Sequence, residues 1–357
     1  MELANLSLVL NLFYLGAITT QFRRDAVLLE LLPVEFDGNA SLTWDVKYDN
    51  RDTAGPRAEG YVVQSSDYST HGREQAVIGW AHYEGYASVT GTAQRVAGAN
   101  SRYGSANALM AEEITDAVKE LAVKIGQHAY SGSASASPRE IEGLARAVDS
   151  TGTYAGLAQG DYAWWASGEN TLATASLSIQ NIREKLFRPF KDATGKYPEF
   201  VICNGANWDR VAALFDDSTR IVVDTIQVGD GRGGLKTVQL KQMGARALTI
   251  DGVPFIEDRH CTSNTFYALH TEFLGWRQVA PTWVSLDPGQ IQMKILEATG
   301  DQVDINEIKA LMDTAGRAIS FQINALAKTG DATSLQLVAD FQLRLKRRNA
   351  AAKLILT

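Results

Sequence analysis

The sequence predicts an α+β fold in which one long helix lies between an extended polar β-region and a compact mixed lobe. Residues 105–130 carry apolar side chains at steps of three and four, the period of an amphipathic helix. Residues 37–100 contain short runs that alternate apolar and polar side chains, with few large aliphatic ones. Residues 171–280 alternate helix-like and strand-like segments, as a compact α+β lobe does.

The helix at residues 105–130 has two distinct faces. At 1.5 Å per residue it would form a rod of roughly 35 Å. Its expected core face consists of Ile114, Val118, Leu121 and Ile125. Its other face is acidic and carries Glu112, Glu113, Asp116 and Glu120. Helical spacing spreads these carboxylates along a surface instead of pairing them for catalysis, so we expect them to face solvent or basic residues of a neighbouring copy.

Residues 1–36 read as a helical arm that is more apolar than a free terminus should be. The apolar stretch at residues 3–18 follows no Lys or Arg, is interrupted by Asn5, Ser7 and Asn11, and is too short to cross a bilayer comfortably. We therefore expect no membrane partner. The arm is predicted to lie against the rest of the molecule or a second copy.

The polar β-region at residues 37–100 has too few apolar side chains to form a core alone. Leu42, Trp44 and Val46 alternate with polar neighbours and predict a strand with one covered face. Two further strands are predicted at residues 75–83 and 86–92, joined near Gly85. Because a sheet of two or three strands is marginally stable in water, this region should pack on another subunit.

The segments after the long helix also contain predicted helices and strands. A loop at residues 131–138 precedes a short helix. Residues 335–345 place an apolar side chain at every second position and predict a strand, and residues 350–356 predict a closing strand. Between them and the mixed lobe, residues 291–295 predict a strand and residues 305–312 a short helix.

Composition excludes several classes of protein. A net charge of −7 and a pI near 5.4 argue against a dedicated nucleic-acid binder, which would be basic. The two cysteines, Cys203 and Cys261, are far apart in sequence and fit no metal spacing, so we expect free buried thiols. His260 adjoins Cys261, but neighbours on a strand point to opposite faces, which does not suit a Cys–His nucleophile pair. No catalytic residue, metal site or cofactor is predicted.

Two other clusters are open to a structural or a functional interpretation. The glycine-rich residues 229–234 lack the ending of a phosphate-binding loop and predict a hairpin tip. The basic cluster near the C-terminus is either the outer face of a strand or a contact for phosphates. Its members are Arg344, Lys346, Arg347 and Arg348. The pair Trp164–Trp165 is typical of packing.

Three segments resemble one known family. Residues 131–156 (SGSASASPREIEGLARAVDSTGTYAG), 197–215 (YPEFVICNGANWDRVAALF) and 248–270 (LTIDGVPFIEDRHCTSNTFYALH) resemble the loop after the spine helix, a strand–turn–helix and an Asp-Gly-x-Pro segment of tailed-bacteriophage major capsid proteins. The order of predicted elements also resembles this family, which has the HK97-like fold. The resemblance implies a non-enzymatic protein that builds an icosahedral shell of hexamers and pentamers around double-stranded DNA.

The resemblance also implies a division into domains. Residues 1–36 would be the N-arm, 37–100 the extended β-hairpin E-loop, 101–170 the P-domain with its spine helix at 105–130, and 171–280 the A-domain. Residues 281–357 would return to the P-domain and A-domain sheets. The implied intersubunit residues of the E-loop are Trp44, Lys47, Arg51, Arg57 and Arg73. The implied loop at the capsomer axis consists of Gly229, Asp230, Gly231, Arg232, Gly233 and Gly234.

The same resemblance implies partners and a location. The partners would be other copies of the chain, portal and scaffolding proteins, a decoration or cement protein, and packaged DNA held by weak non-specific contact. The protein would reside in the virion capsid after assembly in the host bacterial cytoplasm. Because the chain starts almost directly at the arm, we expect any scaffolding segment to be absent or separate. Lys47 lies at the base of the E-loop and not at its tip, so we expect no covalent cross-link there.

Three alternatives stay open from the sequence. An encapsulin-type compartment has the same fold but houses a protein cargo. A soluble α+β enzyme would be a monomer or small oligomer. A tail or head-completion protein would form rings or tubes.

Overall fold

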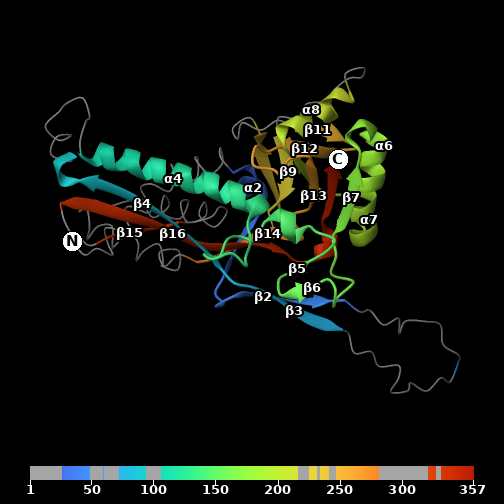
Figure 1. Ribbon diagram of the computed structural model, residues 1–357, viewed down its shortest axis with the longest axis horizontal. Helices are drawn as coiled ribbons and strands as arrows, with labels where there is room; N and C mark the ends of the chain where they lie inside the picture. Colours follow the sequence, from blue (N-terminus) through green and yellow to red (C-terminus); the bar gives the residue numbers. More distant parts are fainter. Residues whose placement is uncertain are drawn as a thin grey trace.

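The described part of the chain forms two main sheets, with a long helix beside one of them and short helices around the other (Figure 1). The computed structural model describes residues 26–48, 59, 72–93, 106–215, 225–230, 234–240, 247–280, 321–326 and 331–357. The predictions for residues 1–25, for the strand at 291–295 and for the helix at 305–312 fall outside these residues.

The first sheet has five strands and β16 (Ala332–Leu345) at its centre. β4 (Ala81–Thr90) pairs along one edge of β16, and β15 (Gln322–Ala325) and β14 (Leu274–Val279) pair along the other. β1 (Val34–Asp37) adds to β14 in parallel. Every second residue of β16 from Leu335 to Leu345 is at most 3% exposed, which confirms the predicted alternation.

The long helix α4 (Ala106–Ser131) runs beside this sheet and packs against β4 (Figure 1). Ile114, Val118, Leu121 and Ile125 are each at most 5% exposed. They join the same apolar cluster as the buried residues of β16, so the helix and sheet share one core. Removing such side chains from water is the main favourable term in folding.

Gly85 corrects one prediction. The sequence suggested a turn there, but β4 runs unbroken from Ala81 to Thr90 and the chain bends at Gly79 and Trp80 instead. A Cβ at Gly85 would lie 2.8 Å from Leu121 Cδ1. This glycine therefore lets the strand approach the helix closely and does not mark a turn.

The second sheet has six strands. Their order is β11 (Ala247–Ile250), β12 (Val253–Glu257), β8 (Phe200–Cys203), β13 (Thr265–Leu269), β17 (Ala352–Leu356) and β7 (Gly168–Leu172). A second apolar cluster joins one face of this sheet to the helices beside it. Those helices are α6 (Ile179–Ile182), the π-helical turn η4 (Arg183–Phe187), α7 (Arg188–Thr194) and α8 (Gly205–Ala213).

The chain crosses between the sheets twice in its last third. β14 already belongs to the five-stranded sheet, although it lies before residue 280, where the sequence suggested a boundary. β16 then leads directly into β17, which confirms the predicted closing strand and places it in the six-stranded sheet. Where the sheets meet, the Tyr130 hydroxyl at the end of α4 donates to the buried Asp258 carboxylate at 2.7 Å.

Smaller elements complete the fold. Two antiparallel pairs, β2 (Leu42–Lys47) with β3 (Arg73–Ile78) and β9 (Thr225–Gly229) with β10 (Leu235–Gln239), confirm the predicted strand at residues 42–47 and the predicted hairpin around residues 229–234. The other short elements are α2 (Val27–Leu31), α5 (Leu144–Ala147), β5 (Thr153–Tyr154), β6 (Leu157–Ala158), η3 (Thr174–Ser176) and η5 (Arg348–Ala350).

Candidate interaction groove

A groove of about 690 Å³ separates the β2–β3 hairpin from the end of β16. Among the residues that the structure describes, its lining contains five cationic side chains and one carboxylate, that of Asp45. We call it the basic groove, lined by Trp44, Asp45, Val46, Lys47, Arg73, Arg344, Lys346 and Arg347. The positive charge comes from segments about three hundred residues apart in sequence that the fold brings together.

The alternation of β2 positions the hairpin side of the groove. Leu42 and Val46 point into the protein and are at most 5% exposed, so Lys47 is left on the surface. The Trp44 indole N–H donates to the Lys346 carbonyl at 3.1 Å, which fixes β2 against the chain that follows β16. The two walls of the groove are therefore held together by a direct hydrogen bond.

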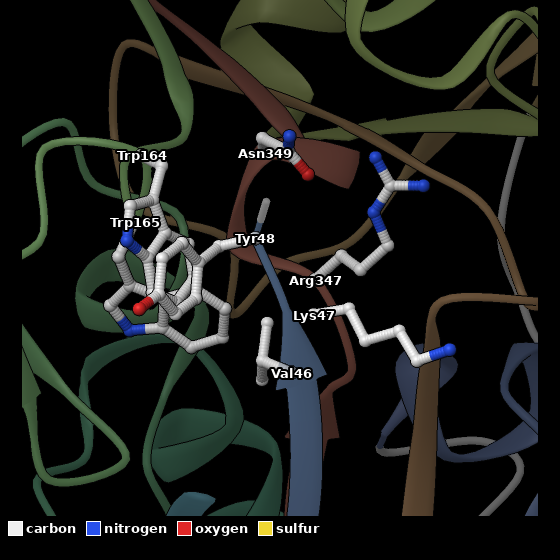
Figure 2. A pocket seen from close by; sticks show the side chains of 7 residues that line it. All are labelled: Val46, Lys47, Tyr48, Trp164, Trp165, Arg347 and Asn349. Carbon is white, nitrogen blue, oxygen red and sulfur yellow. The ribbon is translucent and has the colours of Figure 1, made fainter. Parts of the chain in front are cut away.

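An adjoining pocket of about 270 Å³ continues past the end of β2 (Figure 2). Figure 2 shows Lys47 and Arg347 extending to one side, away from the aromatic rings on the other. The rings of Tyr48 and Trp164 are stacked 4.7 Å apart at 8°. Trp164 also meets the buried Trp165 edge-on at 5.4 Å, so this pair packs, as the sequence indicated.

The cations of the groove are crowded. Burial and the nearby Arg277 guanidinium lower the pKa of Arg344 to about 10. Burial and Arg344 likewise lower the pKa of Lys346. Glu35 lies 4.0 Å from Arg344 but also pairs with Arg277, so one carboxylate serves two guanidinium groups. Like charges this close repel one another, so the groove favours an anionic neighbour.

Arg348 is a correction to the basic cluster. The sequence grouped it with Arg344, Lys346 and Arg347 on a surface, but Arg348 is 1% exposed. Its guanidinium donates to five backbone carbonyls at 2.5–3.3 Å, those of Arg146, Ala147, Thr151, Gly152 and Trp165. Arg348 follows the end of β16, where the strand alternation no longer holds, and it ties the loop after α5 to the C-terminus.

The other residues singled out in the sequence are placed as follows. Trp44, Lys47 and Arg73 lie together in the basic groove, whereas Arg51 and Arg57 fall outside the described residues. No local pattern predicts that Arg344, Lys346 and Arg347 join them, because these residues lie far from β2 and β3 in the sequence. On α4, the acidic face formed by Glu112, Glu113, Asp116 and Glu120 is exposed.

The hairpin tip at residues 229–234 is anchored where the six-stranded sheet approaches β14. The Gly229 N–H donates to the Glu199 carboxylate, which also accepts from the Thr271 N–H and hydroxyl. The Gly234 N–H donates to Asp230 Oδ1 at 2.8 Å and closes the turn. Gly231, Arg232 and Gly233 lie outside the described residues.

The described part of the chain offers little for catalysis. Burial raises the pKa of the Cys261 thiol well above its ordinary value, which disfavours the nucleophilic thiolate. Within the described ranges, no group of three or more His, Cys, Asp or Glu side chains is arranged to hold a metal ion. Within the same ranges, no helix combines the length and the apolar character needed to cross a bilayer.

Comparison with protein families identifies the chain. Residues 81–357 match the SU10 major capsid protein family. This chain belongs to that family. It is a structural capsid protein and not an enzyme, and its place is the capsid of a virion. The resemblance to tailed-bacteriophage major capsid proteins is confirmed. No curated protein matches the sequence.

Solved structures confirm the α+β HK97-like fold of this major capsid protein. The cyanophage A-1(L) capsid protein shares 16% identity at a TM-score of 0.62, with 92% of this chain and 91% of that chain covered. The Mycobacterium phage Bobi structure shares 10% identity at a TM-score of 0.52, covering 93% and 90%. The SrpI encapsulin of Synechococcus elongatus PCC 7942 shares 10% at 0.51, covering 92% and 86%.

Proposed function

We propose that this major capsid protein assembles into hexamers and pentamers of an icosahedral shell that encloses double-stranded DNA. The observation that carries the proposal is the family match over residues 81–357, which spans all of α4 and the six-stranded sheet and most of the five-stranded sheet. Capsid proteins of this family self-associate into a shell. The HK97-like resemblance implies that such a shell is built from hexamers and pentamers. Both are units with closed rotational symmetry.

We further propose the division into N-arm (1–36), E-loop (37–100), P-domain (101–170), A-domain (171–280) and returning C-terminal segment (281–357), with β4 and β14 joining the five-stranded sheet beside α4 across these boundaries. The β2–β3 hairpin supports the E-loop assignment because it lies outside both main sheets as a separate two-stranded sheet (Figure 1). Such a sheet is marginal alone and is stabilised by packing on another surface. Its intersubunit residues are proposed to be Trp44, Lys47, Arg51, Arg57 and Arg73. The tip at residues 229–234 is proposed to lie near the capsomer axis.

The proposed partners correspond to three steps: the start of shell assembly, the filling of the shell with DNA and the closure of the shell. They are a portal protein, a scaffolding protein and a decoration or cement protein, with assembly in the host bacterial cytoplasm. The net charge of −7 favours only weak, non-specific contact with packaged DNA, because like charges keep the polymer from adhering to the wall.

Negative-stain microscopy of the expressed protein, together with size-exclusion chromatography, tests the proposal. We expect closed particles of uniform diameter that elute in the void volume. Tubes, isolated rings or a monomer at all concentrations would overturn it. The SrpI encapsulin likeness motivates a second reading of the same sample: a co-purified protein cargo in place of nucleic acid would indicate a compartment instead of a virion shell.

A further inference from the structure

We propose that the basic groove of one subunit receives the acidic face of α4 from a second copy, in a head-to-tail contact. The inference rests on the proposed self-assembly and names the two surfaces that meet. The groove offers Lys47, Arg73 and the cations at the end of β16 and directly after it. The partner surface is the exposed row Glu112, Glu113, Asp116 and Glu120.

The groove has more positive charge than its own carboxylates neutralise. Among the described residues, five cations line it against Asp45, while Asp37 acts on Arg344 and Glu272 acts on Lys346 from outside the lining. Glu35, the carboxylate beside Arg344, is shared with Arg277. Lys47, Arg73 and Arg347 are exposed. An anionic surface seated here would be attracted by several cations at once, which guides association and fixes the register of two partners.

The acidic face of α4 has the matching properties. Its four carboxylates recur at steps of one, three and four, so they lie on neighbouring turns of one helix. Among the side chains that the structure describes, Asp116 is the one of these four with an ion-pair partner, Lys119 at 2.9 Å. At 1.5 Å per residue, Glu113 and Glu120 are separated by about 10 Å along the axis, a length that one groove can accommodate. The helix is also rigid, because its opposite face is buried in the core.

The two surfaces cannot meet within one molecule. In Figure 1, the first half of α4 lies at one end of the long axis, whereas β2 and the end of β16 lie much farther along it. The contact must therefore join different copies. Because the two surfaces are different, the contact is heterologous, and repeated heterologous contacts close into rings when the rotation allows. A capsomer is such a ring.

Nucleic acid is the competing occupant, since phosphates also seek cations. Two observations favour a second copy. The aromatic rings beside the groove stack on one another, Tyr48 on Trp164, instead of presenting a row of free faces to bases. The chain itself carries an exposed row of carboxylates, so every assembly of this chain contains one such row for each groove.

Charge reversal with rescue tests the contact. In the groove variant, Lys47→Glu and Arg347→Glu are combined, and in the helix variant Glu113→Arg and Glu120→Arg. All four residues are exposed, so circular dichroism and the thermal midpoint should match wild type. We expect each variant to lower the yield of closed particles at least tenfold, and the chain carrying both reversals to recover most of the yield.

A matched control separates this contact from a general effect of charge. Arg188→Glu with Lys191→Glu makes the same change of charge on exposed residues of α7. If the groove variant forms particles as well as this control does, or if the combined variant shows no recovery, the inference is wrong while the wild-type shells still support the proposed function. A groove variant that assembles normally but no longer retards a double-stranded DNA fragment in a gel would assign the groove to nucleic acid and overturn the inference. Failure of the wild type to form any particle would instead overturn the proposed function.

Discussion

The interface between α4 and its sheet differs from the basic groove in what fills it. The first contains Val118, Leu121 and Ile125 against β4 and β16, all nearly excluded from solvent. The second contains crowded cations, of which Lys47, Arg73 and Arg347 are exposed, beside a hairpin with few buried residues. Apolar packing stabilises the folded subunit on its own. A cluster of like charges becomes stabilising only when a surface of opposite charge binds to it. The difference separates what folds the subunit from what joins it to others.

Leu121→Asp should give the largest effect, because it places a carboxylate in the apolar interface between α4 and its sheet. Leu121 lies against Gly85, and a carboxylate there would be buried without a partner. We expect the free energy of unfolding to fall by about 4 kcal/mol or more, enough to leave little folded subunit. Urea unfolding followed by circular dichroism measures it. Glu113→Lys, on the exposed face of the same helix, should leave the unfolding curve unchanged. A stable Leu121→Asp protein would show that the helix is oriented differently.

Arg348→Met should have the next largest effect. It leaves five backbone carbonyls without their donor; the hydrogen bonds to Ala147 and Trp165 are the two buried ones, and a buried unsatisfied carbonyl costs about 1–3 kcal/mol. We expect a loss of about 3 kcal/mol in the free energy of unfolding. The neighbouring Arg347→Met is the control and should change stability by less than about 0.5 kcal/mol, because Arg347 is exposed. Equal effects of the two substitutions would mean that the hydrogen bonds from the Arg348 guanidinium to backbone carbonyls do not stabilise the fold.

These two residues also show how far the sequence carries. The period of residues 335–345 and of α4 predicts which side chains are buried, because strand and helix geometry fix that pattern locally. The role of Arg348 is not local: its acceptors lie near residues 146–165. The sequence around Gly85 indicates a turn, because nothing in its own neighbourhood reveals that Leu121 approaches it. The groove is not predictable for the same reason, since Trp44 and Lys346 meet only in the folded chain.

Glu169 provides a smaller effect and a contrast with the crowded groove cations. It faces Lys353 across β7 and β17 at 3.1 Å. Burial alone would raise its pKa, but hydrogen bonds from Ser150 and Lys353 outweigh burial and lower the pKa of Glu169 to about 2. Because the folded value lies below the ordinary 4.5, the pair stabilises the fold above pH 4.5, and this contribution is lost as the pH falls toward about 2.

Glu169→Gln should therefore be destabilised relative to wild type at pH 7, by about 1 kcal/mol, and the two proteins should converge as the pH approaches 2. Thermal midpoints measured from pH 7 to pH 2 give the comparison. Glu113→Gln, an exposed carboxylate, should follow wild type at every pH. A Glu169→Gln deficit that stays constant with pH would exclude the ion pair as its cause.

Shortening the hairpin should have the smallest effect on stability and the sharpest effect on assembly. Tyr48 N–H donates to the Gly72 carbonyl at 3.2 Å, directly beyond the last β2–β3 pair, Lys47 with Arg73. Replacing residues 49–71 by Asn-Gly keeps that register and supplies a two-residue hairpin turn. Both main sheets keep their strands, so we expect no loss in the free energy of unfolding and a gain of up to about 2 kcal/mol, because a shorter loop costs less entropy to close. Particle counts by microscopy should nevertheless fall to background. Stable subunits that still build normal shells would show that residues 49–71 are not needed for contacts between subunits.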